Sequence, residues 1–298
     1  MKNAKKILGV LLAGLLMASA SGCGLVASAN SSKAPASAAG PSQTASAADG
    51  SWDKVKTSGQ LVLGFDKAFP PMGYIDTETG KTVGFDIDMA TQACKRMGIK
   101  IKFQPIDWEN KAAELNNGNV DCLWNGFSKT EERDKQFNLS IPYMKNNQII
   151  LIKTGSSYKG LNSLAGKTVG VQSDSSAETA LNGAANAAFK KSLKDVVRID
   201  DYSKAVLEIQ NGTVDAIAID EVVARYYLTK KPGAYAVLQD KDGKDVSLAV
   251  EDYVVGFRKN DGALKGKVEE ALKEMSKDGT AAKISQKWFG KDVVTLPK

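Results

Sequence analysis

Apolar runs alternate with amphipathic segments along most of the chain. Residues 61–65 form a continuous apolar run, which predicts a buried strand that ends at Asp66. In residues 85–97 an apolar side chain recurs at every fourth position, which predicts a helix with one buried face, and Asp86 is the expected N-cap. Similar strand-like and helix-like segments alternate through the remaining sequence. This pattern predicts an α/β fold.

One segment of the chain is repeated 94 residues later. Residues 107–123 and 201–217 share Asp, Glu, Asn, Gly, Val and Asp at equivalent positions, and each predicts a helix, an Asn-Gly turn and a strand. We therefore expect two similar α/β lobes with a cleft between them. Gly126 and Asp220 lie at equivalent strand ends, where open α/β sheets bind ligands. One lobe should present its backbone there and the other a carboxylate.

The N-terminal 51 residues differ in composition from the rest. A basic start and an apolar run of eleven residues, 7–17, precede Cys23, and this run is too short to span a bilayer. The pattern predicts a signal peptide over 1–22 and a lipidated Cys23, although Ala20 stands where leucine is usual and a plain signal peptide is the alternative. Residues 23–51 are nearly all small or polar, which predicts a disordered tether. We expect an extracytoplasmic protein anchored to the cell membrane.

Composition excludes several classes of function. The 298 residues include 40 basic and 34 acidic side chains, and removal of residues 1–22, with three lysines, lowers the net charge from +6 to +3. This mild charge, without a basic block among aromatic residues, predicts no nucleic-acid partner. No second apolar run of about 18 residues occurs, so the folded body should be soluble.

Histidine is absent and cysteine is scarce. The lack of histidine excludes His-based triads and His metal ligands, and we expect neither a cofactor nor a metal. Cys94 and Cys122 remain in the body after Cys23. We expect both to be buried free thiols, with a disulfide as the alternative in an oxidising compartment.

Several short motifs occur in a fixed order along the body. They are Asp66 with Phe69, Gly84–Asp88, Asp107–Trp108, Gly126–Arg133, Ile219–Asp220 and Trp288–Gly290. In this order and spacing, residues 52–298 resemble the polar amino-acid-binding proteins of bacterial ABC importers, the group of the glutamine- and lysine/arginine/ornithine-binding proteins. The resemblance implies a periplasmic-binding-protein-like fold of type II, with lobe one at 52–146 plus 252–298 and lobe two at 147–251, joined by two crossovers that act as a hinge. It also implies a monomeric binding protein, not an enzyme, that delivers an amino acid to a permease with a separate ATPase subunit.

The resemblance further implies which groups bind the backbone of the ligand. Its carboxylate would be held by groups from both lobes, namely Arg133, Ser128, Ser175 and Ser176. Its ammonium would be bound by the carboxylate of Asp220 and the carbonyl of Gly126. The alternatives are an exposed arginine in a charged run for Arg133 and helix capping for Ser175, Ser176 and Asp220.

Three more residues would contact the side chain of the ligand. Phe69 and Trp108 resemble the aromatic pair that encloses its stem, with core packing as the alternative. Asp66 matches the acidic residue at the far end, which favours glutamine or a basic amino acid over aspartate and glutamate. Trp124 and Asn125 depart from the small or aliphatic residues of the group, so the pocket shape and the ligand stay open.

Two other functions remain as alternatives. A dehydratase or lyase of the same fold would need a placed general acid or base, and Glu178 is the only nearby candidate, for which helix capping is the simpler explanation. A ligand sensor would need a partner receptor, since the sequence contains no kinase or cyclase domain.

Overall fold

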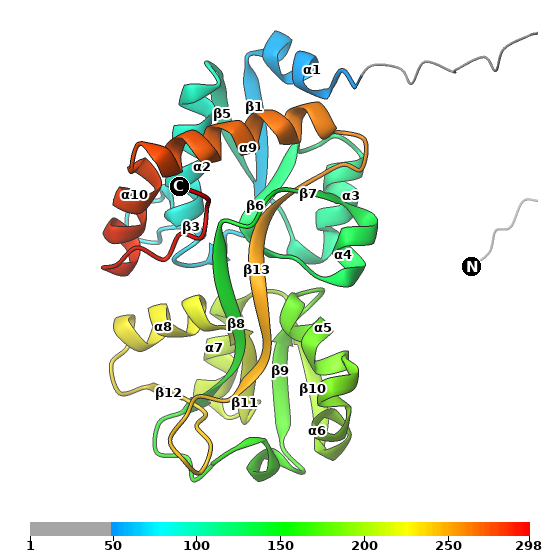
Figure 1. Ribbon diagram of the computed structural model, residues 1–298. Helices are drawn as coiled ribbons and strands as arrows, with labels where there is room; N and C mark the ends of the chain where they lie inside the picture. The colour runs from blue at the N-terminus through cyan, green and yellow to red at the C-terminus, as the bar shows by residue number, and fades with distance from the viewer. Residues whose placement is uncertain (1–48) are drawn as a thin grey trace, which may run out of the picture. The chain divides into compact units, whose positions relative to one another are not determined.

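The computed structural model describes residues 49–298, and the predicted signal peptide, Cys23 and most of the predicted tether lie outside them. Figure 1 shows two α/β lobes joined by two long strands, β8 (Met144–Lys153) and β13 (Ser247–Phe257). The predicted α/β class is confirmed. Within residues 49–298, no helix is long and apolar enough to cross a membrane.

The first lobe combines the start and the end of the described chain, which lie together at the top of Figure 1. Its strands are β1 (Gln60–Phe65), β2 (Ala68–Phe69), β3 (Gly73–Ile75), β4 (Thr82–Val83), β5 (Lys100–Pro105), β6 (Cys122–Ser128) and β7 (Asn138–Leu139). Its helices are α1 (Ser51–Ser58), α2 (Phe85–Arg96), the 3-10 turn η1 (Trp108–Asn110), α3 (Lys111–Asn116), α4 (Glu131–Gln136), α9 (Gly262–Lys277) and α10 (Thr280–Phe289).

The second lobe is formed by the middle of the chain. Its strands are β9 (Thr168–Gln172), β10 (Asp195–Ile199), β11 (Ala216–Asp220) and β12 (Tyr235–Val237). Its helices are η2 (Leu161–Leu164), α5 (Ser176–Asn182), η3 (Ala184–Asn186), α6 (Ala187–Ser192), α7 (Tyr202–Asn211) and α8 (Glu221–Lys230).

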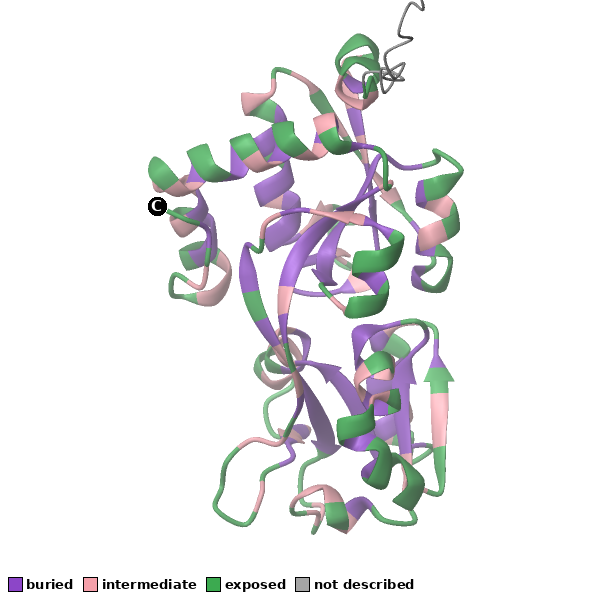
Figure 2. Ribbon diagram, turned by 45° about the vertical axis from the view of Figure 1, so that its right-hand side comes forward, coloured by how far each residue is buried: buried purple, intermediate pink, exposed green. Residues whose placement is uncertain are grey.

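A single path of hydrogen-bonded strands runs through both lobes, in the order β10-β9-β11-β8-β13-β6-β1-β5. Strands β5 and β6 pair with β1 in parallel, as do β10 and β11 with β9, whereas β8 and β13 are antiparallel to their neighbours. Figure 2 shows that the strands are largely buried while the outer faces of the helices are exposed. This burial explains the apolar runs of the central strands β1, β9 and β11, whereas the edge strands β5 and β10 are partly exposed and contain charged residues.

Both copies of the repeat fold as helix, turn and strand, as predicted. The first comprises η1, α3 and β6, and the second comprises α7 and β11. Strand β6 is irregular, because Leu123 lies opposite Gly256 whereas Phe127 lies opposite Val254. An advance of four residues along β6 therefore corresponds to an advance of only two residues along β13, so β6 bulges over Trp124–Gly126. Bulges of this kind often re-aim groups beside functional sites.

The prediction that Asp86 caps α2 is wrong. Gly84 occupies the cap position, and Asp86 lies in the first turn with its side chain fully buried. Its Oδ2 atom accepts hydrogen bonds from the backbone N–H of Gly126 at 2.6 Å and the hydroxyl of Tyr143 at 2.9 Å. The bulged backbone of β6 thus supplies the donor that a helix terminus would otherwise have provided.

Candidate functional site

The carboxyl ends of β1 and β6 in the first lobe face those of β9 and β11 in the second. All nine residues predicted to bind ligand are buried. Hydrogen bonds join the lobes directly at this place: the hydroxyl of Ser176 donates to that of Ser128 at 3.0 Å, and Gln172 Nε2 donates to Asp66 Oδ2 at 2.6 Å.

Arg133 lies inside the protein, so an exposed arginine is excluded. Its side chain packs over the ring of Phe127, with 4.4 Å from Cζ to the ring centroid. One terminal nitrogen donates to the carbonyl of Ser128 at 3.0 Å and the other to the carbonyl of Asp174, across the lobes, at 3.2 Å. Burial lowers the pKa of Arg133, opposed chiefly by Glu251. A buried guanidinium of this kind suits an anionic group.

Asp220 precedes α8 but makes no side-chain cap hydrogen bond. Its Oδ1 atom instead accepts from Asn146, Gln148 and Tyr253, each at 2.8 Å, and these three residues lie on β8 and β13. Burial, together with the nearby Glu251, raises the pKa of Asp220 to about 7. The carboxylate is therefore held by the strands that connect the lobes.

The two serines at the start of α5 have different contacts. Ser175 is the N-cap, and its hydroxyl accepts from the backbone N–H of Glu178 at 3.1 Å. Ser176 lies in the first turn and contacts Ser128 and Gln148. The carboxylate of Glu178 accepts from the backbone N–H of Asp174, so capping accounts for its position.

The bulge in β6 positions the predicted ligand-binding residue Gly126 and its two neighbours, Trp124 and Asn125. Gly126 has a positive φ of 58°, and a Cβ atom there would lie 2.7 Å from Phe69. The neighbouring Asn125 accepts a hydrogen bond from the backbone N–H of Asp66 at 2.7 Å. Trp124 is fully buried and packs against Tyr143, which places it in the core.

Asp66 is a buried residue that lines a cavity of about 250 Å³. Its Oδ1 atom accepts from the backbone N–H of Ala68 at 2.8 Å. Burial raises the pKa of Asp66 to about 6. The cavity is lined by five acidic side chains, Asp66, Asp107, Glu109, Asp200 and Asp201, and by two basic ones, Lys67 and Lys204.

The two predicted aromatic residues have different surroundings. The ring of Phe69 packs against Tyr202 of the second lobe with centroids 5.7 Å apart, whereas Trp108 lines the cavity and meets Phe127 edge-on at 5.9 Å. Lys111 lies over the indole of Trp108 and forms an ion pair with Asp174 across the lobes. Burial lowers the pKa of Lys111 to about 8.

Sequence reasoning missed the residues of β8 and β13 that reach this site. Gln148 Nε2 donates to Glu251 Oε2 at 2.9 Å, and both side chains are buried. No local motif marks them. Gln172 did carry a signal, because Val169-Gly170-Val171-Gln172 matches Leu63-Gly64-Phe65-Asp66 as a glycine-containing strand that ends in a polar residue.

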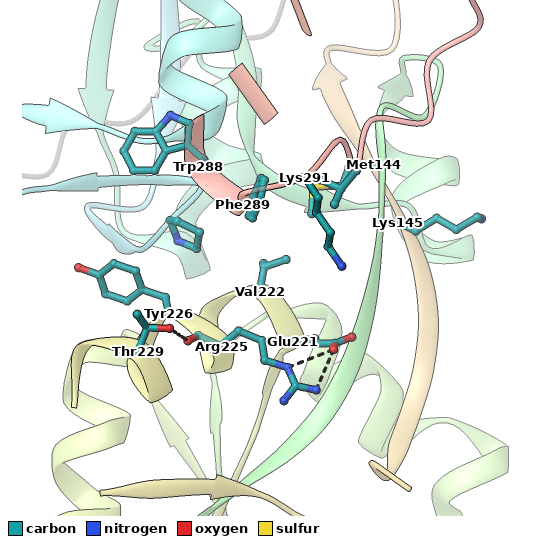
Figure 3. Close-up of a pocket in the computed structure, with 12 residues that line it drawn as sticks. Met144, Lys145, Glu221, Val222, Arg225, Tyr226, Thr229, Trp288, Phe289 and Lys291 are labelled. Atoms are coloured by element: carbon teal, nitrogen blue, oxygen red, sulfur yellow. Dashed lines mark hydrogen bonds and ion pairs between the residues drawn. The ribbon is translucent and has the colours of Figure 1, made fainter. Parts of the chain in front are cut away.

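A larger cavity of about 560 Å³ lies elsewhere, beside the connecting strands (Figure 3). Trp288 and Phe289 of α10 face Val222 and Tyr226 of α8 across it, and Arg225 pairs with Glu221 at its edge. None of the nine predicted residues lines this cavity.

Neither cysteine of the described chain is bonded. Cys94 and Cys122 are buried free thiols, which confirms the preferred interpretation. Among residues 49–298, no group of three or more acidic or cysteine side chains is arranged to hold a metal ion.

Comparison with known proteins adds independent findings. Residues 61–291 match the family model of bacterial extracellular solute-binding proteins, family 3. The chain is 32% identical to an L-cystine-binding protein of Bacillus subtilis, over 81% of this chain and 85% of that protein, and 32% identical to an arginine-binding extracellular protein of the same organism, over 77% and 86%. A histidine-bound ABC uptake transporter substrate-binding protein from Streptococcus pneumoniae superposes with a TM-score of 0.77 at 36% identity, covering 84% of this chain and all of that one.

Proposed function

Because the chain belongs to family 3 of the bacterial extracellular solute-binding proteins, we propose that it captures a polar L-amino acid between its lobes and delivers it to an ABC permease. The observation that carries this proposal is the burial of a guanidinium on the first lobe, Arg133, and of a carboxylate on the second, Asp220. An α-amino acid carries one group of each complementary charge. Glutamine or a basic amino acid is favoured because the carboxylate of Asp66, which lines the neighbouring cavity, can accept hydrogen bonds from the side chain of such a ligand.

The binding mechanism we propose is closure of the lobes on the ligand. Lobe one comprises 52–146 plus 252–298 and lobe two 147–251. These boundaries fall where β8 and β13 pair, with Asn146 opposite Glu251 and Asn147 opposite Val250. Because the contacts of Ser128 and Arg133 to the second lobe form only when the lobes meet, a ligand that bridges them would favour the closed arrangement.

A titration of the purified chain with single amino acids tests this proposal. The panel is L-arginine, L-lysine, L-ornithine, L-histidine, L-glutamine, L-citrulline and L-cystine, with heat of binding and the rise in Tm as readouts. Binding of at least one amino acid supports the function. Binding of none of them, while the chain melts cooperatively, would overturn it.

We also propose that Cys23 carries a lipid anchor, supported by the basic, apolar and small-residue pattern before it. Cys23→Ser should move the protein from the membrane fraction to the soluble extracytoplasmic fraction of the producing cells. A variant that stays with the membrane would show that another segment retains it.

A further inference from the structure

Three acceptor groups surround the side-chain nitrogen of Gln148. Its Nε2 atom lies 2.8 Å from Asp220 Oδ1, 2.9 Å from Glu251 Oε2 and 3.0 Å from Ser176 Oγ. A carboxamide nitrogen has two N–H groups, whereas an ammonium has three. Gln148 Oε1 is buried and has no hydrogen-bond partner among residues 49–298. The amide therefore matches its surroundings poorly, and the three acceptors fit a primary ammonium group better.

The buried charges at this place do not balance. Glu251 is the acidic group that acts most strongly on Arg133, and it is also the main charge that repels Asp220. Asp66, Asp220 and Glu251 are buried carboxylates of this region, whereas Arg133 is its buried guanidinium. Lys111 does not compensate, because it is paired with Asp174. Buried charge without a partner is costly, so the site favours added positive charge.

The cavity beyond Asp66 has the same bias. It is lined by five acidic and two basic side chains, and one of these lysines, Lys204, already pairs with Asp200 at 2.6 Å. A cationic side chain that extends past Trp108 would therefore meet a negative environment.

We propose that Glu251 is a specificity-determining residue that, together with Asp66, restricts the ligand to amino acids with a net positive charge. This inference rests on the proposed function. Glu251 and Asp220 share the α-ammonium, while Arg133 holds the carboxylate. A cationic side chain then compensates Asp66, whereas a neutral zwitterion leaves the excess negative charge in place. Neutral amino acids such as L-glutamine and L-cystine are thereby disfavoured.

The test compares L-arginine with L-citrulline, which has a similar shape and a neutral side chain. Calorimetric Kd values at pH 7.5 should favour arginine in the wild-type protein by about a hundredfold, because its guanidinium compensates a buried carboxylate that the neutral side chain of citrulline leaves uncompensated. Glu251→Gln preserves the shape and should reduce this ratio by about tenfold or more.

Asp252→Asn is the matched control, because it removes one negative charge from the neighbouring residue of the same strand. Asp252 is partly exposed and pairs with the exposed Lys145. Its arginine/citrulline ratio should equal that of the wild-type protein.

These measurements distinguish a failure of the proposed role of Glu251 from a failure of amino-acid binding itself. Equal affinity for arginine and citrulline in the wild-type protein, or an unchanged ratio in Glu251→Gln, would overturn the inference while amino-acid binding stands. If the panel shows no binding of any amino acid, both fail. If Glu251→Gln does not fold, Glu251→Ser, which also removes the charge, takes its place, and an unchanged arginine/citrulline ratio there would overturn the inference.

Discussion

In the two copies of the repeat, the aspartate that begins the strand has the same role. Asp121 Oδ2 accepts from the backbone N–H of Val62 on β1, and Asp215 Oδ2 accepts from that of Thr168 on β9, both at 2.9 Å. The glycines of the two turns, Gly118 and Gly212, have φ values of 78° and 76°. The turn and the start of the following strand are thus held in the same way in the two lobes.

The copies differ at the two ends that face the other lobe. Asp201 caps α7 by accepting from the N–H of Lys204, whereas Asp107 makes no such bond and is followed by a 3-10 turn that brings Trp108 to the cavity. Strand β6 bulges at its end, whereas β11 stays regular up to Asp220. The shared residues therefore build the scaffold, whereas Trp108 within the first copy, and Gly126 and Asp220 just after the two copies, are places where the copies diverge and the proposed site lies.

The largest effect should follow from removing the charged site residue of one lobe. Arg133→Ala and Asp220→Ala should each weaken amino-acid binding by about a hundredfold or more, because each leaves an opposite buried charge unpaired. Calorimetric titration measures this. Arg225→Ala, which removes an exposed arginine of the second lobe, should bind normally. If either site variant keeps wild-type affinity, the ligand is not held jointly by the lobes.

The stability of the protein without ligand should depend on pH in both lobes. The pKa values of Asp66, Asp86 and Asp220 are raised by burial to about 6, 7 and 7 from 3.8. The folded state thus binds these protons more tightly, and the stability they contribute is present below about pH 4 and is lost as pH rises to about 7.

Asp86→Asn tests this dependence in the first lobe. Asparagine can place its oxygen at Oδ2 and keep the contacts to Gly126 and Tyr143. The fall in the free energy of unfolding between pH 4 and pH 8 should shrink by roughly 2–4 kcal/mol. Urea unfolding at each pH measures it. A slope equal to that of the wild-type protein would show that Asp86 is ionised throughout.

Glycine-to-alanine substitutions should lower the free energy of unfolding less in the two repeat turns than at Gly126 in the proposed site. Gly118→Ala and Gly212→Ala should each cost about 1 kcal/mol and agree with each other, because both have left-handed φ values with open space at the Cβ position. Gly126→Ala should cost about 2–3 kcal/mol, because its Cβ would also collide with Phe69. Chemical unfolding measures the loss of stability in all three variants. An equal loss in all three would show that Gly126 is no more constrained than the glycines of the turns.

The smallest effect concerns two ion pairs that join the lobes. Lys111 is buried and contacts Asp174, whereas Arg198 is half exposed where it bridges Glu109 and Glu178. Lys111→Met should weaken ligand binding by about fivefold, and Arg198→Met by less than twofold, because exposed pairs contribute little. Titration at low salt measures both. The reverse order would show that the exposed pair stabilises closure.

The repeat could be predicted because its signals are local: a helical period, an Asn-Gly turn and an apolar strand. The same local rules misjudged Asp86, because its hydrogen-bond donor comes from a bulge forty residues away. Gln148 and Glu251 escaped notice for a related reason. They meet only because β8 and β13 pair between the lobes, at positions a hundred residues apart in sequence.

The first lobe is assembled from both ends of the described chain, since α9 and α10 pack beside α1 and α2. During synthesis the strands and helices of the second lobe are complete before α9 has been made. The first lobe is thus completed last, when the C-terminal helices α9 and α10 cover α1 and α2. A chain truncated before Gly262 would retain the whole second lobe and leave the apolar face of α2 uncovered, which would expose it to proteolysis.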